Sequence, residues 1–532
     1  MIFSQIPLIV DWIMKRTLPR QIFSIRLRQM DRAAVANFAA LVLILIAAVG
    51  VRVWRLNEIG YNTDEAVYAG QAAAISRDPT LKEIFPIFRA HPLLFQFMFA
   101  MLYGFGITDL AGRLLAVAIG VATVLVVYLL GKILYGREAG LLAALILAVM
   151  PYHVIVTRQV LLDGPLVFCS TLTLYLMARY AVTGNSAWLH AVGVGMGLTF
   201  LAKETGIILL GSVYAFFALS PEIRIRIRDI IISVLLMFAM ILPFPVSLWL
   251  AGGSTTGQQY FIWQFFRRPN HTWDFYLTTT PGAIGILVIL AALLGLLFLY
   301  RQSSWREKLL LLWILVPVIF FQIWPTKGYQ YLLPIAPPVA VLAARALTRW
   351  STSRSIAIRD REIDLNWLKM GLAGIVIISV VLSSWRIIQP ATSGTFLAGT
   401  GGVPGGREAG QWVLENVPEG ATLMTIGPSM ANILQFYGNR QAMGLSVSPN
   451  PLHRNPSYDP IDNPDLQIRT NEIQYVVWDS YSAGRSDFFS EKLLELAVRY
   501  HGRIVHTETV PLTTESGQKI DKTVIIIYKV HP

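Results

Sequence analysis

The residues of this chain that could take part in chemistry are acids, bases and histidines that lie between apolar stretches. Asp64 and Glu65 are adjacent in "GYNTDEAVYAG", ten residues past a long apolar run, and Asp163, Lys203 and Lys327 occupy similar places further on. A positioned carboxylate can act as a general base, and Lys or Arg can neutralise the charge of a phosphate. This mixture of types is the composition of a reactive site.

The composition indicates a polytopic membrane protein with a polar tail. Of the 532 residues, 54% are hydrophobic and 14% are charged, whereas soluble domains carry about 25% charged residues. The net charge is +12, but most Lys and Arg flank apolar segments, so we expect them to contact membrane lipids rather than nucleic acid. The single cysteine, Cys169, excludes a disulfide within the chain and a cysteine-based metal site.

Eleven apolar runs have the length of a membrane-spanning helix. They are 36–54, 113–131, 138–156, 164–182, 187–202, 205–220, 229–251, 281–300, 309–324, 329–347 and 370–388. A twelfth run, "HPLLFQFMFAMLYGFG" from His91, is ambiguous. If it does not span, the basic loops all lie on the side of the basic segment 1–35, as the positive-inside rule favours. We therefore expect a re-entrant or interfacial helix there.

This topology places the N-terminus in the cytoplasm and the tail, 392–532, outside the cell membrane. The outer loops then carry, in order, Asp64 and Glu65; Arg158 and Asp163; Lys203 and Glu204; Arg267, Arg268 and His271; and Lys327 with Tyr329. The tail begins with the Gly/Pro-rich linker "SGTFLAGTGGVPGG" and then alternates helix-like and strand-like runs, which predicts a small α/β domain. It lacks a Gly-rich phosphate loop, which argues against nucleotide binding.

Five stretches, in this order and spacing, resemble the GT-C membrane glycosyltransferases, in particular the protein O-mannosyltransferase and aminoarabinose-transferase-like group. They are "TDEAVYA", "HPLLF", "PYHVIVTRQVLLDGPL", "LAKETG" and "KGYQYLLPIAPPVAVLAA". The family pattern is commonly "HPPL", and Leu93 replaces its second proline. The resemblance covers residues 36–391, which it identifies as the glycosyltransferase domain, and leaves the tail with an expected accessory role in acceptor recognition or in stabilising the outer loops.

The resemblance implies a GT-C fold of about eleven spans and an inverting hexosyl or pentosyl transfer on the extracytoplasmic face. The donor would be a polyprenyl-phosphate-linked sugar, and the acceptor a lipid, glycan or protein. It implies that Asp64 and Asp163 are the acidic site residues, and we add Glu65 as a catalytic candidate. The candidates for binding substrate or phosphate are Lys203, Arg158, Lys327, His91, Tyr68, Tyr329, Tyr331, Arg267 and His271.

Each candidate also has a structural interpretation. Asn62 and Glu65 fit a capping box, and Asp163 could simply begin a helix. Lys203 could pair with Glu204. Arg158 could anchor the membrane interface, Arg267 and Arg268 could bind lipid headgroups, and Lys327 is an ionisable residue between apolar segments. Tyr329 and Tyr331 could belong to an aromatic belt. A divalent metal held by His91, His271 and a carboxylate stays open.

Three other functional classes compete with this interpretation. A secondary transporter would place ionisable residues near the bilayer midplane and show internal repeats, and neither feature is evident. An oligosaccharide-block transferase or ligase would share the architecture. A catalytically silent assembly scaffold would keep the fold without turnover. Turnover of the donor separates an enzyme from the transporter and the scaffold.

Overall fold

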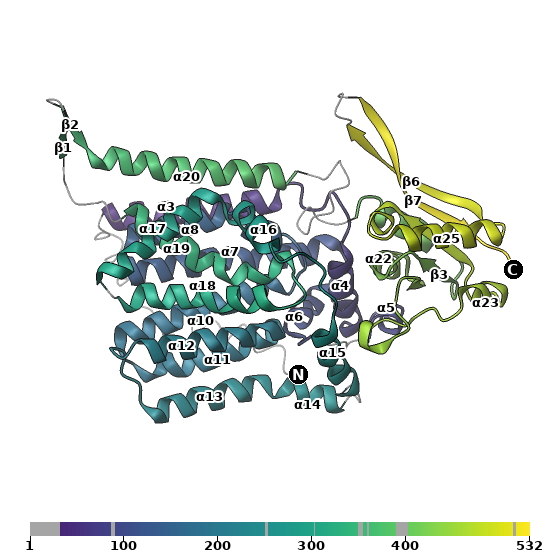
Figure 1. The fold of residues 1–532 in the computed structure, drawn as a ribbon, viewed down its shortest axis with the longest axis horizontal. Coiled ribbons are helices and arrows are strands. Elements are labelled where there is room, and N and C mark those ends of the chain that lie inside the picture. Colours follow the sequence, from purple (N-terminus) through teal and green to yellow (C-terminus); the bar gives the residue numbers. More distant parts are fainter. Residues whose placement is uncertain are drawn as a thin grey trace, which may run out of the picture.

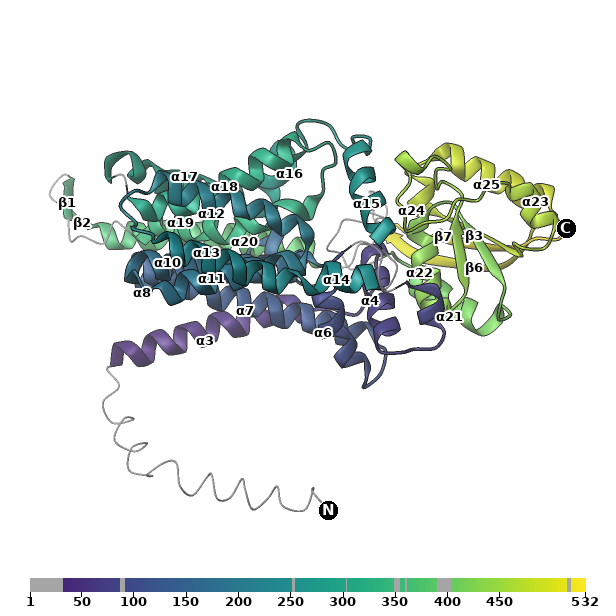
Figure 2. The ribbon, with the colours of Figure 1, turned by 90° about the horizontal axis from the view of Figure 1, so that it is seen from below.

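A computed structural model describes residues 32–86, 91–250, 254–302, 304–348, 355–358, 361–389, 403–513 and 518–532. It contains a bundle of long, roughly parallel helices and, at one end of that bundle, the α/β tail (Figure 1). The first helix of the bundle, α3 (Arg32–Val53), begins at the end opposite the tail (Figure 2). Most of the sequence-predicted linker and most of the basic segment 1–35 lie outside the described residues.

All eleven apolar runs are helical. Besides α3, the main helices are α7 (Asp109–Tyr135), α8 (Arg137–Val149), α10 (Asp163–Thr183), α11 (Ser186–Ala202), α12 (Leu209–Leu219), α13 (Ile227–Ile241), α14 (Pro243–Leu250), α17 (Ile286–Gln302), α18 (Trp305–Ile323), α19 (Ala336–Thr348) and α20 (Leu365–Ile387). By length and composition, six helices in the described residues could cross a membrane, or seven if one bent pair counts as a span. The number eleven therefore stays a prediction.

Two runs that the sequence analysis treats as continuous are broken. The run 281–300 bends by 95° between α16 (Phe275–Ile284) and the helix that follows, because Gly285 takes the left-handed φ of +99° that glycine tolerates. The run 138–156 breaks at Met150, and α9 (Pro151–Val156) restarts with proline in its first turn, where a missing N–H costs nothing. The second break turns the chain toward Arg158 and Asp163.

The elements that the topology prediction assigns to outer loops gather at the end of the bundle that faces the tail (Figures 1 and 2). They are α4 (Thr63–Ile75), α5 (Leu81–Ile84), α6 (Leu94–Tyr103), η2 (Glu204–Ile208), α15 (Ser254–Phe266) and η3 (Tyr329–Ile335). The ten residues of α6 extend about 15 Å, half of a hydrocarbon core. The run from His91 thus forms a helix too short to span by itself, and its re-entrant or interfacial placement stays a prediction.

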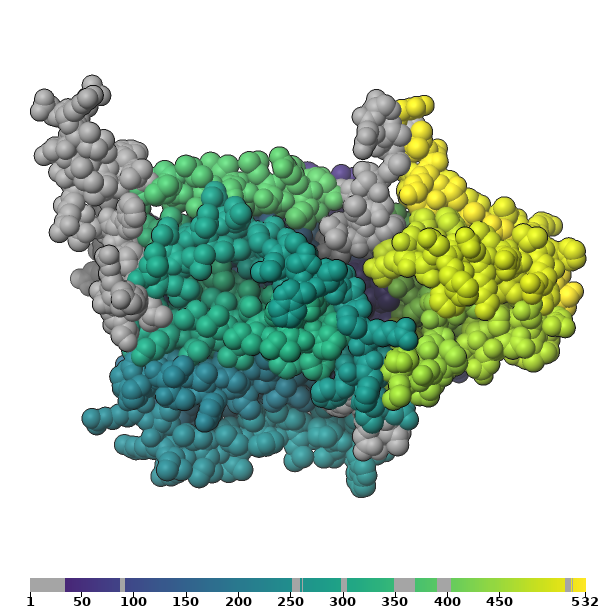
Figure 3. Space-filling view, viewed as in Figure 1, coloured from purple at the N-terminus to yellow at the C-terminus, as the bar shows by residue number. Residues whose placement is uncertain are grey.

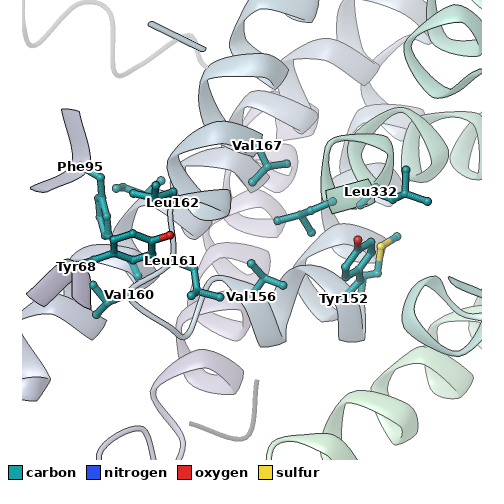
Figure 4. Close-up of a cluster of buried hydrophobic side chains, with 14 of the residues drawn as sticks. Tyr68, Phe95, Tyr152, Val156, Val160, Leu161, Leu162, Val167 and Leu332 are labelled. Atoms are coloured by element: carbon teal, nitrogen blue, oxygen red, sulfur yellow. The ribbon is translucent and has the colours of Figure 1, made fainter. Parts of the chain in front are cut away.

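A layer of buried apolar side chains supports these loops (Figure 4). Tyr68 of α4 lies against Phe95 of α6 and the segment Val160–Leu162, and all of these side chains are at most 9% exposed. Burying aromatic and branched side chains stabilises by about 1.5–3 kcal/mol each. The contact fixes α4 and α6 against the loop that precedes α10.

The tail is an α/β domain, as predicted. Its sheet has the order β4-β3-β5-β7-β6, with β3 parallel to β4 and β5, and β7 antiparallel to β5 and β6. The strands are β3 (Thr422–Thr425), β4 (Gln441–Gly444), β5 (Tyr475–Asp479), β6 (Arg503–Thr513) and β7 (Lys519–Lys529); the helices are α21 (Gly406–Asn416), α22 (Pro428–Gly438), α23 (Pro464–Arg469), α24 (Ser480–Ala483) and α25 (Asp487–Arg499), with η4 (Pro451–His453). The short edge strand β4 was not predicted from the sequence.

The tail docks directly on the first outer loop. Arg407 of α21 pairs with Asp109 at 2.7 Å, and the Tyr437 hydroxyl of α22 donates to the same carboxylate at 2.5 Å. The backbone N–H of Tyr61 donates to the Tyr437 hydroxyl at 2.7 Å, and the rings of Tyr61 and Phe436 lie 5.3 Å apart. The tail is thus attached just before the first turn of α4.

Replacing Tyr437 with Phe is expected to loosen this attachment. The change leaves the N–H of Tyr61 without its acceptor, and such a loss costs about 1–3 kcal/mol. Hydrogen–deuterium exchange should rise at residues 60–66 and 428–438. The matched control, Tyr500→Phe, removes a hydroxyl that bonds to Asp465 within the tail. It should leave exchange at residues 60–66 and 428–438 unchanged. Unchanged exchange in both variants would contradict the docking.

Candidate active site

Asp64 lies in the first turn of α4, where its side chain is exposed to a small cavity. The cavity has a volume of about 80 Å³ and is lined by Asp64, Val67, Tyr68, Gln71, His91, Tyr260, Asn455, Ser457 and Tyr458. Although the carboxylate is accessible, protein surrounds the cavity, and this burial raises the pKa of Asp64 while the charges of Lys203 and His91 oppose the rise. Asp64 is thus a reachable carboxylate whose basicity is increased.

A capping box sets where α4 begins and leaves Asp64 outside the cap. The Asn62 side chain accepts from the N–H of Glu65 at 3.0 Å, and the Glu65 carboxylate accepts from the N–H of Asn62 at 3.0 Å. The sequence-predicted capping box is therefore confirmed. The Asn62 amide also donates to Gln159 at 2.7 Å, which joins the first outer loop to the second.

Glu65 has a full set of structural partners. Its carboxylate is buried and accepts from Arg113 of α7 at 2.9 and 3.0 Å, as well as from the N–H of Val160 at 3.1 Å. Arg113 also donates to the carbonyls of Leu56, Ile59 and Gly60. These bonds hold the loop that carries Asp64 to α7 and to the second outer loop. The catalytic role suggested for Glu65 has no support in these contacts.

Asp163 and Lys203 form a buried ion pair near Asp64. Both oxygens of the Asp163 carboxylate accept from the Lys203 ammonium at 2.9 Å, and the side chains are 4% and 8% exposed. The ammonium also lies 5.0 Å from the centre of the Tyr331 ring. Lys203 thus pairs with Asp163 rather than with Glu204, which corrects the structural alternative. The separate alternative for Asp163, that it begins a helix, agrees with its position in the first turn of α10.

Glu204 pairs instead with His91, at 2.8 Å. The other ring nitrogen of His91 lies 3.5 Å from the Tyr260 hydroxyl, and the His91 ring meets Tyr68 edge-on. The sequence analysis named His91 and Tyr68 as candidates, considered Glu204 only as a partner of Lys203, and did not name Tyr260. The motif "LAKETG" contains Glu204, so a signal for it existed; Tyr260 lies outside every quoted motif.

Three other candidates bond to the ends of helices or to neighbouring backbone. Arg158 donates to the carbonyls of Val51 and Trp54 at the end of α3, and Lys327 to those of Gln322 and Trp324 at the end of α18. Cations are favourable at helix C-termini. The carbonyl of Tyr329 accepts from the Tyr152 hydroxyl. None of these three residues lines the Asp64 cavity, so their substrate-binding role stays a prediction.

The fourth outer loop contributes Arg267 and His271. Arg267 lies over the Trp263 ring at 4.4 Å, donates to Gln264, and its charge favours the ionised form of Asp64, lowering the pKa of that carboxyl. His271 is exposed and stacks on Phe275 at 4.1 Å. Among the described residues, no group of three or more His, Cys, Asp or Glu side chains could hold a metal ion, so the suggested bridge between His91 and His271 finds no ligand cluster.

The chain is similar in sequence to known membrane glycosyltransferases. Residues 90–249 match the family described as dolichyl-phosphate-mannose-protein mannosyltransferase, and residues 270–389 the Alg9-like mannosyltransferase family. A curated relative, the undecaprenyl phosphate-alpha-4-amino-4-deoxy-L-arabinose arabinosyl transferase of Pectobacterium carotovorum, is 27% identical over 54% of this chain and 53% of its own length. The chain thus spans about half the length of the curated relatives it matches.

Solved structures resemble nearly the whole chain. ArnT from Cupriavidus metallidurans in the apo state has a TM-score of 0.68 at 15% identity, covering 92% of this chain and 98% of that one. The same protein bound to undecaprenyl phosphate has a TM-score of 0.64, also at 15% identity, covering 93% and 97%. The oligosaccharyltransferase of Archaeoglobus fulgidus has a TM-score of 0.60 at 12% identity, covering 91% and 74%. At these identities the likeness shows the fold.

Proposed function

Because the chain is a polytopic helical membrane protein with the GT-C fold of membrane glycosyltransferases, we propose that it transfers a monosaccharide from a polyprenyl-phosphate donor to an acceptor, with inversion at the anomeric carbon. The observation that carries this proposal is the position of Asp64. It is a reachable carboxylate of raised pKa in a cavity between the helical bundle and the tail, with the Lys203 and Arg267 charges acting on it.

The proposed step is a single displacement. Asp64 accepts the proton of the acceptor hydroxyl, the acceptor oxygen bonds to the anomeric carbon, and the bond from that carbon to the phosphate oxygen breaks. The electron pair leaves with the polyprenyl phosphate. Lys203 and Arg267 do not line the cavity, but their charges act on Asp64, so we assign them to neutralising the phosphate charge. Asp163 holds Lys203 by both carboxylate oxygens, so we assign it a positioning role.

The curated relatives described above are arabinosyl transferases, which favours a monosaccharide over an oligosaccharide block. The test is turnover by the purified full chain of two radiolabelled undecaprenyl-phosphate donors, one with a monosaccharide and one with an oligosaccharide. We expect the monosaccharide donor to be consumed. Consumption of the oligosaccharide donor alone would favour the block transferase, and consumption of neither would reject both.

The site is proposed to face the extracytoplasmic side of the cell membrane. The outer-loop residues and the tail share one end of the bundle, and the basic inner loops lie at the other (Figure 1). In a Cys169→Ala background, Val498→Cys, which is exposed on α25, should react with a membrane-impermeant thiol reagent in sealed cells. Arg226→Cys, exposed in the loop before α13, should react only after permeabilisation. The reverse pattern would overturn the orientation.

A further inference from the structure

A second, larger cavity adjoins the Asp64 cavity on the side of the tail. It has a volume of about 350 Å³ and lies between α5 of the first outer loop and the tail elements α22 and β4. Ser457 and Tyr458 line both cavities, so these two side chains form a wall that the cavities share. In the space-filling view, a hollow between the bundle and the tail exposes the first outer loop (Figure 3).

The lining of the larger cavity is rich in neutral hydrogen-bonding groups. They are the side chains of Asn432, Gln435, Gln441, Ser457 and Tyr458. Its charged residues, Lys82, Glu83 and Asp459, are of both signs and give no excess of positive charge that would select an anion. Amides and hydroxyls that both donate and accept suit a ligand with many hydroxyl groups.

Parts of this lining are held in place before any ligand binds. The Asn432 amide donates to the Tyr458 hydroxyl at 3.1 Å, and the Gln435 amide donates to the carbonyl of Ala442 at 3.0 Å. Asn432 is 1% exposed. The volume falls within the usual range for ligand pockets, about 300–1,000 Å³. A preorganised cavity of this size loses little entropy on binding.

We propose that this larger cavity is the acceptor site, that the acceptor is an uncharged carbohydrate, and that the tail determines acceptor specificity through it. The inference rests on the proposed function. Ser457 and Tyr458 separate a sugar bound against α22 and β4 from Asp64, so in the proposed complex these two side chains move apart and let an acceptor hydroxyl reach the carboxylate. The proton of that hydroxyl moves to the Asp64 carboxylate. At the same time the hydroxyl oxygen bonds to the anomeric carbon of the donor sugar, and the polyprenyl phosphate leaves with the electron pair of the broken bond.

The test compares transfer with donor hydrolysis, using a panel of methyl glycosides of hexoses and pentoses as acceptor probes and dodecyl phosphate as an anionic probe. We expect wild-type protein to glycosylate at least one methyl glycoside in preference to dodecyl phosphate. Gln441→Trp, which fills the cavity from an exposed position, should raise the acceptor KM at least tenfold and lower the ratio of transfer to hydrolysis. Gln435→Leu is the second variant and should act in the same direction.

The outcomes separate this inference from the function on which it rests. The control Tyr500→Phe should leave both the acceptor KM and the hydrolysis rate unchanged. Absence of any donor turnover in wild-type protein would reject the proposed function itself. Three outcomes would overturn the acceptor site and leave the proposed function standing, provided that the donor is turned over. They are transfer only to dodecyl phosphate, no transfer to any glycoside, and an acceptor KM that is unchanged in both Gln variants.

Discussion

Replacing Asp64 with Asn is expected to lower the turnover of a polyprenyl-phosphate sugar by about 10²–10⁴-fold, the usual contribution of a general base. The amide keeps the size of the side chain but cannot accept the proton of the acceptor. Donor affinity should change little, so the loss should fall on kcat rather than on KM. The measurement is steady-state transfer by the purified variant, together with its thermal unfolding midpoint to show that it folds.

Two further readouts make this expectation specific. Burial raises the pKa of Asp64, so wild-type turnover should rise with pH through a value above the ordinary aspartate pKa of about 3.9, and Asp64→Asn should abolish that rise. Asp274→Asn is the matched control, because Asp274 is an exposed outer-loop acid whose side chain makes no cap bond to α16. Near-wild-type turnover in Asp64→Asn would reject Asp64 as the base.

Replacing Glu65 with Gln is expected to destabilise the fold by about 3–5 kcal/mol, because it leaves the buried Arg113 guanidinium without its counter-charge. A capping residue alone would predict about 1 kcal/mol, and the ion pair with Arg113 is the reason for the larger value. The thermal unfolding midpoint in detergent should fall by several degrees, and activity per folded molecule should fall much less than in Asp64→Asn.

The control for this loss is the exposed pair of Arg55 and Glu58, whose side chains are 44% and 38% exposed. Exposed pairs contribute about 0–1 kcal/mol, so Glu58→Gln should barely move the unfolding midpoint. Equal shifts in the two variants would mean that the buried pair with Arg113 contributes no more than a surface pair. A folded Glu65→Gln without turnover, beside an active Asp64→Asn, would show that the two acids were assigned in reverse.

The local features of the chain could be predicted from its sequence, because short-range patterns determine them. Hydrophobic runs gave the helices, Asn62 and Glu65 gave the capping box, and alternating runs gave the α/β tail. The breaks at Met150 and Gly285 were not predicted, because proline and glycine alone do not mark a break: Pro317, for example, lies inside the continuous helix α18. The structure resolves the first break at a proline and the second at a glycine.

Partners between distant segments could not be predicted from single motifs. Lys203 has Glu204 beside it in sequence, yet the start of α10 brings Asp163 to its ammonium instead. Likewise, no pattern in the tail indicates that Ser457 and Tyr458 line the same cavity as Asp64. Such contacts depend on how the tail sits on α4, through the bonds of Tyr61 and Tyr437, which are 376 residues apart in sequence.

That separation also has a consequence for biogenesis. Ribosomes add about 5–20 residues per second, so Tyr61 emerges roughly 20–75 s before Tyr437, and during that interval the growing chain lacks one wall of the cavity around Asp64. A nascent chain whose membrane helices have all been made would still lack the part of that cavity lined by Ser457 and Tyr458. The order of synthesis therefore makes the docking of the tail on α4 a late step in forming the cavity.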